Sequence, residues 1–294
     1  MENKLIDKQF HATLSLKHVT RFDYTEPVVL GYSEMHMMPS NTALQQVIEA
    51  GMRVSPACDV GMHRDYFGNI VHHFNILGPH RHVEIISEAI VHTENRTSAG
   101  EGDPEDARPA GQRFAEFLHW SKGVPMLDEY ASVRHDVNPA MHVDVFEQSL
   151  SDLAAYFVDN FRYDPDVTHV HSTPKELFEH GGGVCQDMAH AMIGVLRLAG
   201  IPTRYVSGYI YDAHKAEAKA EQVRGAAATH AWVQAWHPEG GWCGIDPTNN
   251  KPVGWQYIRT AVGRDYYDVT PVKGLFRGDV EQQLTVEVEV SRIS

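Results

Sequence analysis

The sequence predicts a mixed α+β protein, and three observations lead to that class. Residues 9–94 read as a series of short strands with turn residues between them. Helical periodicity begins only after residue 112. Strands rich in aromatic and β-branched residues then return between 203 and 248. Strands and helices that are segregated along a chain in this way are typical of α+β proteins.

The first 95 residues are predicted to form a β-sandwich. The segment 10–24 alternates between apolar and polar positions, with Leu14 and Leu16 on one side of the strand. Pro27 is expected to interrupt this strand. Four further strand candidates follow, at 28–38, 45–56, 69–77 and 82–94. Strands at this spacing, with no long helical pattern between them, favour two packed antiparallel sheets.

The domain boundary is predicted at residues 96–111, which are polar and rich in glycine, proline and acidic residues. That composition is typical of a linker between domains. The second domain is then predicted to cover 112–262, with a C-terminal extension at 263–294. The closing strand of the chain, within 280–294, is expected to return to the N-terminal β-sandwich.

A strong amphipathic helix is predicted over 142–161. Its apolar stripe contains Val145, Leu150, Leu153, Ala154 and Phe157. The segment 113–122 is a shorter helix candidate, and the residues after 161 are expected to run as loop and turn toward the next helix.

The next helix is predicted to begin at Cys185. The glycines at 181–183 end the preceding segment, apolar or small residues then recur at helical spacing, and Gly200 with Pro202 supplies a stop signal. A thiol in the first turn faces unpaired backbone N–H groups and the positive end of the helix dipole, which favour the reactive thiolate. Asp187 would oppose this effect if it lies close. A buried cysteine that only packs is the alternative interpretation.

Two aromatic-rich strands, 229–236 and 242–248, are predicted to form a β-hairpin. The length of the loop places residue 230 opposite residue 246, within one position. His230 and Asp246 would then share one face of the hairpin. An imidazole held by a carboxylate supplies the base and the orienting group that a thiol nucleophile needs.

The composition limits the partners and the compartment. The 294 residues carry a formal net charge of −14, which argues against nucleic acid or an anionic membrane as the main partner. No apolar run is long enough to span a bilayer, and the first residues lack the apolar core of an export signal. Because Cys58, Cys185 and Cys243 cannot all pair within the chain, a reduced, cytoplasmic protein is expected.

Two further features of the sequence are its many histidines and a charged segment at 212–228. The chain has 19 histidines, but no Cys/His spacing or HExxH pattern accompanies them, so no metal and no cofactor are expected. Residues 212–228 are charged and alanine-rich, with no apolar face. Because they lie between two core strands, they are interpreted as an exposed insertion and a candidate lid.

Three strings of the sequence together resemble the transglutaminase-like superfamily: GVCQDMAHAMIGVLRLAGIPTRYVSGY, THAW and GWCGIDPTN. More narrowly, the chain is similar to bacterial transglutaminase-like proteins that are often labelled cysteine peptidases. That group carries its nucleophile in G-V-C-Q-D, its histidine in H-A-W and its aspartate in D-P-T, which match Cys185, His230 and Asp246. The strings HVTRFDYTEPVVLGYSEMHMMPS and DYFGNIVHHF resemble the N-terminal β-domain of the same group. Cys243 stands where relatives often have a hydrophobic residue.

The resemblance implies a papain-like α+β core and acyl-transfer chemistry on a peptide or amide substrate. A cysteine peptidase or amide hydrolase that works through Cys185, His230 and Asp246 is the first hypothesis. Acyl transfer to an amine and a non-catalytic peptide-binding module are the alternatives. Gln186 and Trp232 are further candidates for contacts with the oxyanion or the substrate. The oligomeric state remains open.

Overall fold

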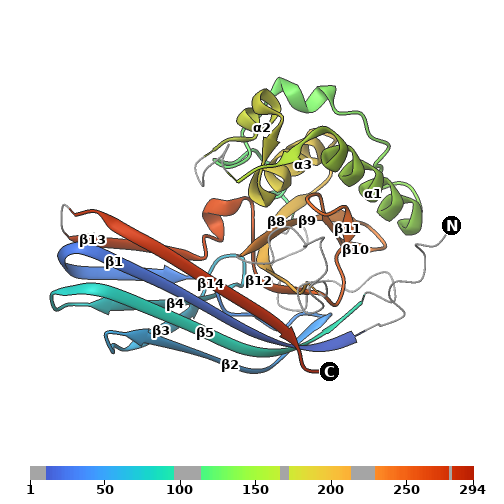
Figure 1. Cartoon of the computed structure of the whole chain (residues 1–294). Helices are drawn as coiled ribbons and strands as arrows, with labels where there is room; N and C mark the ends of the chain where they lie inside the picture. The colour runs from blue at the N-terminus through green and yellow to red at the C-terminus, as the bar shows by residue number, and fades with distance from the viewer. Residues whose placement is uncertain (1–10, 96–113, 166–171, 213–228, 278–279) are drawn as a thin grey trace.

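A long bent strand, β1 (His11–Met35), takes part in both layers of an N-terminal β-sandwich (Figure 1). This computed structural model describes residues 11–95, 114–165, 172–212, 229–277 and 280–294. The first half of β1 pairs with β5 (His80–Glu94), whose other side pairs with β2 (Gln45–Ser55). The second half of β1 pairs with β4 (Ile70–Ile76), which in turn pairs with β3 (Val60–Arg64).

The C-terminal end of the chain adds one strand to each layer. Strand β13 (Val272–Arg277) pairs with the second half of β1, and β14 (Gln282–Arg292) pairs with the first half from Leu14 to Tyr24. In Figure 1 the red ribbon of β14 runs beside the blue ribbon of β1. The first and the last strand of the described chain therefore lie in the same sheet.

Two sequence predictions for the sandwich are wrong in detail. Strand β1 does not end at Pro27, because the proline sits where the pairing with β5 shifts register between Asp23 and Val28. A register shift of this kind leaves a residue without a ladder hydrogen bond, so it tolerates a proline. The short strand β3 was not predicted at all, since it has only five residues and one of them is a glycine, which is rare in strands. The linker predicted at 96–111 lies outside the described residues.

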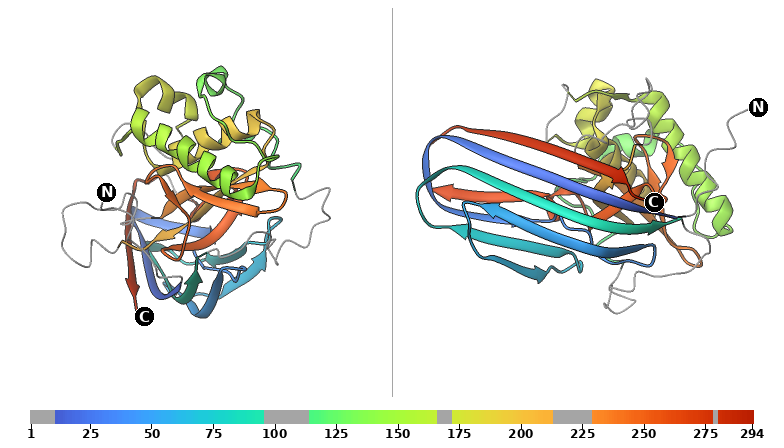
Figure 2. Two further views of the ribbon diagram at one scale, coloured as in Figure 1. Left: turned by 90° about the vertical axis from the view of Figure 1, so that its right-hand side faces the viewer. Right: turned by 60° about the horizontal axis from the view of Figure 1, so that its bottom comes forward.

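The C-terminal half contains a five-stranded antiparallel sheet in the order β11-β10-β9-β8-β12. The strands are β8 (Thr203–Ile210), β9 (His230–His237), β10 (Gly241–Asp246), β11 (Lys251–Pro252) and β12 (Tyr257–Gly263). The helices α1 (Val143–Asn160), α2 (Pro174–His180) and α3 (Cys185–Leu198) gather on the side of this sheet away from the sandwich, as Figures 1 and 2 show. The predicted α+β class is thereby confirmed.

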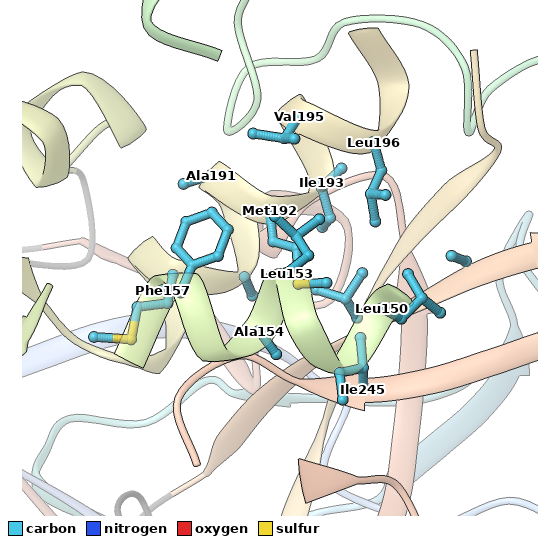
Figure 3. Packing of buried hydrophobic residues seen from close by; sticks show 14 of the residues in the cluster. Leu150, Leu153, Ala154, Phe157, Ala191, Met192, Ile193, Val195, Leu196 and Ile245 are labelled. Carbon is cyan, nitrogen blue, oxygen red and sulfur yellow. The ribbon is translucent and has the colours of Figure 1, made fainter. Parts of the chain in front are cut away.

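Helix α3 is the centre of the second core. Nearly all its residues are buried, and its apolar side chains pack against the stripe of α1 and against β9 (Figure 3). The stripe of α1 is formed by Phe146, Leu150, Leu153 and Phe157, at helical spacing. Val145, predicted for this stripe, is instead 50% exposed. Gly194 allows the close approach of Tyr130, because a Cβ atom there would lie 2.2 Å from the ring.

Helix α2 was predicted as loop, and the prediction is wrong. Thr173 precedes the helix, Pro174 is its first residue, and the carboxylate of Glu176 accepts a hydrogen bond from the Thr173 backbone N–H at 3.1 Å. Gly181 ends it in the left-handed conformation, with φ 65°. All of these are recognised start and stop signals for a helix.

The helix predicted over 113–122 is also not formed, since residues 114–118 make turns. The carbonyl oxygens of Phe117 and His119 accept hydrogen bonds from the buried guanidinium of Arg197. Phe117 and Phe114 pack on the indole rings of Trp242 and Trp236, at 5.4 and 4.5 Å between ring centroids. Tertiary contacts therefore outweigh the weak helical preference of this segment.

The shorter elements of this half are β6 (Arg162–Tyr163), β7 (Gly182–Gly183) and two 3-10 helices, η1 (Asp128–Ser132) and η2 (Tyr266–Asp268). Strands β6 and β7 pair in parallel, which fixes the backbone just before Cys185.

The sandwich packs closely on the five-stranded sheet. Leu14 and Leu16 of β1 share a buried cluster with Tyr209 of β8. The same tyrosine has its hydroxyl oxygen 2.7 Å from Nδ1 of the buried His18. The two halves of the molecule thus share both apolar and polar buried contacts.

Candidate active site

Cys185 is the first residue of α3 and is partly exposed. The preceding residue, Val184, is extended, and its backbone N–H donates to Oδ2 of Asp187 at 2.9 Å. Gly183 makes room for that carboxylate, since a Cβ atom there would lie 2.7 Å from Oδ2. Asp187 therefore caps the helix start. The thiol lies at the positive end of the helix dipole, with the Asp187 carboxylate in the same first turn.

His230 is the first residue of β9, and its Nε2 lies 2.8 Å from Oδ2 of Asp246, the last residue of β10. Both side chains are buried, at 1% and 0% exposed. The predicted register of the hairpin is wrong by two residues, because Gly244 pairs with Gln234, a register that puts residue 232 and not His230 opposite Asp246. A shift of two residues keeps each side chain on the same face. The imidazole and the carboxylate therefore still meet, diagonally across the ladder.

The Asp246 carboxylate accepts five hydrogen bonds. Oδ1 accepts the backbone N–H groups of Thr248 at 2.9 Å and Asn249 at 3.2 Å. Oδ2 accepts from His230, from the Asn249 side-chain amide at 2.8 Å and from the Tyr257 hydroxyl at 2.9 Å. A carboxylate has about four lone-pair directions, so this one is fully satisfied and fixed in place.

The protonation states of the pair follow from burial and charge. Burial lowers the pKa of His230, but the charge and hydrogen bond of Asp246, with an interaction with the Cys185 side chain, outweigh burial and raise that pKa to about 10. Burial raises the pKa of Asp246, but the charge of His230 and the hydrogen-bond donors hold it below its usual value. The pair is therefore an imidazolium facing a carboxylate at neutral pH.

The second ring nitrogen of His230, Nδ1, is buried and has no formed hydrogen bond among the described residues. Because Nε2 is committed to Asp246, Nδ1 is the ring atom left for the Cys185 thiol. The sulfur contributes to the raised pKa of His230 without reaching the geometry of a formed hydrogen bond. Loose contacts of this kind between a nucleophile and its base are common before substrate binds.

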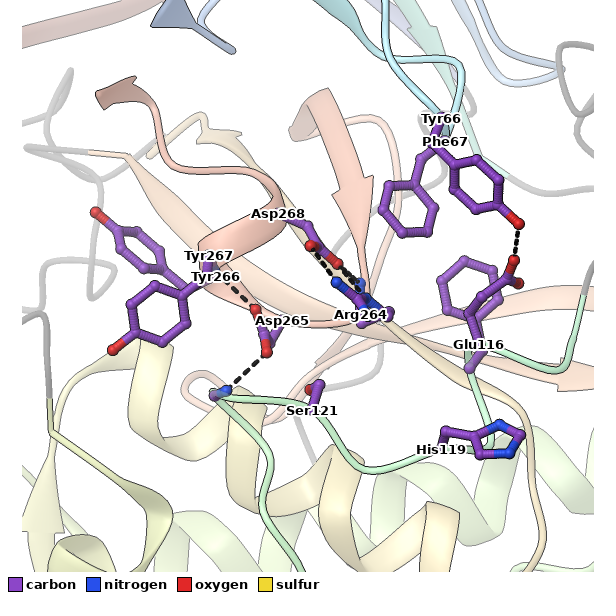
Figure 4. A network of polar contacts seen from close by, with 12 residues as sticks. Tyr66, Phe67, Glu116, His119, Ser121, Arg264, Asp265, Tyr266, Tyr267 and Asp268 are labelled. Carbon is purple, nitrogen blue, oxygen red and sulfur yellow. Dashed lines mark hydrogen bonds and ion pairs between the residues drawn. The ribbon is translucent and has the colours of Figure 1, made fainter. Parts of the chain in front are cut away.

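One flank of the site is built around Asp265. Its carboxylate accepts the backbone N–H of Gly123 at 2.7 Å and that of Tyr267 at 2.8 Å (Figure 4). The backbone N–H of Tyr266 donates to Nε2 of the buried His190 on α3, at 3.0 Å. These bonds hold the segment 264–268 against α3, a turn and a half beyond Cys185.

Gln186 and Trp232, the two lesser candidates, lie in different surroundings. Gln186 follows Cys185 in the first turn of α3 and is 8% exposed. Trp232 is 1% exposed and packs beside His230, with 6.3 Å between ring centroids. Gly208 gives its indole room, because a Cβ atom there would lie 2.6 Å from the ring. Their contacts with substrate stay predictions.

Two residues that the sequence reasoning missed contact Asp246 directly. Asn249 follows it by three positions, and an Asx-type turn, in which the Asp246 carboxylate accepts backbone N–H groups just after it, is a local signal that the sequence offered there. Tyr257 lies on β12 and has no sequence signal that links it to Asp246. Its position became evident only from the fold.

No three His, Cys, Asp or Glu side chains of the described residues gather in a way that could hold a metal ion. The expectation that the protein needs no metal stays a prediction. The candidate lid at 212–228 lies outside the described residues, except Asp212, which is buried.

A helix that carries a cysteine at its start and packs on an antiparallel sheet defines a transglutaminase-like, papain-like class of protein. The chain belongs to the transglutaminase-like superfamily. The model of the Transglutaminase-like superfamily matches residues 140–247, and that of the Bacterial transglutaminase-like N-terminal region matches 14–92. Membership supports cysteine-dependent catalysis in general.

Similar proteins cover either almost the whole chain or a part of it. An uncharacterised protein of Mycobacterium leprae (strain TN) is 32% identical over 280 residues, which are 94% of this chain and 98% of that protein. A Protein-glutamine gamma-glutamyltransferase of Pseudomonas aeruginosa is 40% identical over 84 residues, 29% of this chain and 12% of that protein.

A crystal structure of a candidate cysteine protease from Cytophaga hutchinsonii superposes with a TM-score of 0.72 at 17% identity. The match covers 97% of this chain and 92% of that one, so the two proteins share the fold across both halves. Within the part of the chain that the structure describes, no helix is long and apolar enough to cross a membrane.

Proposed function

We propose that this protein is an amide hydrolase or peptidase that uses Cys185 as its nucleophile, His230 as its acid and base, and Asp246 as the group that orients His230. The observation that carries the proposal is the buried contact of 2.8 Å between His230 and Asp246, which leaves Nδ1 for a thiol at a helix start. Superfamily membership supports the same chemistry.

The reaction follows from these three side chains. The Cys185 thiolate attacks the carbonyl carbon of an amide, and the carbonyl electrons move to oxygen. N–H groups at the start of α3 stabilise the oxyanion. When the tetrahedral intermediate collapses, the C–N bond breaks and His230 Nδ1–H donates its proton to the departing amine. Cys185 is left as an acyl-thioester.

The second half of the reaction decides the product. His230, now neutral, takes a proton from water as the water attacks the thioester carbonyl, and the carboxylic acid and the thiolate are released. The partial exposure of Cys185 supports hydrolysis, because water can reach the thioester.

Acyl transfer to an amine is the second candidate. The specific observation in its favour is the 40% identity over 84 residues with the Pseudomonas aeruginosa glutamyltransferase. An amine in place of water would accept the same acyl group from Cys185. A non-catalytic peptide-binding module remains the third candidate.

The test is incubation with a glutamine-containing peptide amide, with and without a primary amine. Ammonia or peptide release without amine incorporation supports hydrolysis, and incorporation of the amine overturns it in favour of transfer. Cys185→Ser is expected to abolish the reaction, while Cys58→Ser, the matched control for a partly exposed thiol elsewhere, is expected to keep it. No turnover, combined with a Cys185 that iodoacetamide does not alkylate at neutral pH, would favour the binding module.

A further inference from the structure

The edge strand of the five-stranded sheet, β12, is held by two side-chain amides of the N-terminal sandwich. Gln45 at the start of β2 donates from Nε2 to the Arg259 carbonyl at 2.8 Å, and its Oε1 accepts the Arg259 backbone N–H at 2.8 Å. Asn69 in the β3–β4 turn makes the same pair of bonds to Val262, both at 2.8 Å. Each amide thus takes the place of one residue of a neighbouring strand.

Both amides are themselves fixed and buried. Gln45 is 6% exposed, and its Nε2 also donates to the Ser40 carbonyl at 2.7 Å. Asn69 is 4% exposed, and the Asp65 carboxylate accepts both its backbone N–H and its side-chain N–H. Because buried backbone groups are costly to leave without a partner, these two amides attach one edge of β12 to the sandwich, while β8 pairs with the other edge.

Strand β12 begins at Tyr257, whose hydroxyl donates to Oδ2 of Asp246 at 2.9 Å. The ring packs edge-on against Trp232, with 5.2 Å between centroids, and Phe67 from the same turn as Asn69 packs against this cluster. Burial and the neighbouring Asp246 raise the pKa of Tyr257 well above its usual value, so the hydroxyl remains a donor at every working pH.

We propose that Tyr257 is a positioning residue of the active site, and that the N-terminal sandwich sets its place through the Gln45 and Asn69 clamps on β12. Tyr257 acts through Asp246 and His230, and it does not touch the reacting atoms. This inference rests on the proposed function, since it assumes that the His230–Asp246 pair activates Cys185.

The experiment measures how fast iodoacetamide alkylates Cys185 as a function of pH, with mass spectrometry to separate it from Cys58 and Cys243. Tyr257→Phe removes one hydroxyl, and the other four donors keep Asp246 ionised. The hydroxyl is one of three donors to Oδ2, the oxygen that faces His230, so the main loss is the orientation of the carboxylate and imidazole. We expect the midpoint of thiolate formation to rise by about one pH unit, which slows alkylation at pH 6 about tenfold.

The matched control is Tyr209→Phe, which removes a buried hydroxyl from β8 that contacts His18 and the Met37 carbonyl but not Asp246. It is expected to lower the thermal midpoint without moving the pH profile. A Tyr257→Phe profile that coincides with that of the wild type would overturn the inference.

The clamps are tested by Asn69→Leu, alone and combined with Tyr257→Phe. If the clamp acts through Tyr257, Asn69→Leu raises the midpoint in the wild-type background and adds nothing in the Tyr257→Phe background. Additive shifts would refute the link. Ile85→Ala, in the core of the sandwich away from β12, controls for lost stability and is expected to leave the profile in place.

The outcomes separate this inference from the proposed function. A wild-type Cys185 that is no more reactive than Cys58 at pH 6 contradicts the proposed function itself. A reactive wild-type Cys185 with an unchanged Tyr257→Phe profile contradicts only the role of Tyr257.

Discussion

The Asp246→Asn variant tests how far the buried carboxylate controls the nucleophile. The substitution keeps the size of the side chain and removes its charge. His230 has its pKa raised from 6.5 to about 10, against a burial effect that lowers it. A shift of three to four units corresponds to about 5 kcal/mol that favours the imidazolium, and Asp246 is the main source.

Without that charge, burial dominates, and the pKa of His230 is expected to fall below 6.5. The imidazole is then mostly neutral at pH 7, and the Cys185 thiolate loses its counter-ion. We expect alkylation of Cys185 by iodoacetamide at pH 6 to slow by about 100-fold, because the sulfur no longer has a cationic imidazolium beside it. Near pH 9 both proteins carry thiolate, so their rates should converge.

The assay is site-resolved alkylation between pH 5 and 9, with circular dichroism to show that the variant is folded. Asp268→Asn is the matched control, since this carboxylate pairs with Arg264 at 2.8 Å and not with a histidine. An Asp246→Asn protein that reacts as fast as the wild type at pH 6 would refute the ion-pair reasoning. So would an equal loss in Asp268→Asn.

Two further predictions concern stability. His18 is buried as the neutral form, and burial lowers its pKa from 6.5 to about 4. Between these two pH values the unfolded chain therefore binds a proton at His18 that the folded chain does not bind. The free energy of unfolding should therefore fall between pH 6.5 and 4, by up to about 3 kcal/mol from this residue, and His18→Gln should flatten that slope in urea titrations. Arg197, 4% exposed, donates to the carbonyls of Phe117, His119, Thr203 and Arg264, so Arg197→Met should cost about 4 kcal/mol or more in urea unfolding. A loss below about 1 kcal/mol, similar to that of the exposed Lys175→Met, would contradict this role of the guanidinium.

The sequence predicts the elements whose signals are local. Helix α3 begins at Cys185 as expected, because the glycines before it and the apolar period after it both lie within one short stretch. Helix α2 was equally predictable from Thr173, Pro174, Glu176 and Gly181, and it was missed only because the segment is polar and short. Its case shows that capping residues can define a helix where hydrophobic periodicity does not.

The His230–Asp246 contact was predictable in kind but not in register. The period of two along a strand fixes which residues share a face, whereas the loop conformation fixes which residues pair. In the turn after β9, the backbone N–H groups of Glu239 and Gly240 both donate to Nδ1 of His237. Sequence alone does not reveal that the turn closes in this way, and the predicted pairing was two residues out.

The surroundings of Asp246 include a residue that no local sequence pattern indicates. The superfamily match ends at residue 247, while the Tyr257 hydroxyl that completes the carboxylate comes from the strand at the opposite edge of the sheet from β11. That strand, β12, leads through η2 into β13, which pairs with β1. The side-chain amides of Gln45 and Asn69 accept hydrogen bonds from two backbone N–H groups on the edge of β12 that does not pair with β8. These amide contacts join β12, which carries Tyr257, to the N-terminal sandwich. If Tyr257 positions Asp246 as proposed, the place of that carboxylate depends on the N-terminal half of the chain as well as on the helix and sheet that carry Cys185 and His230.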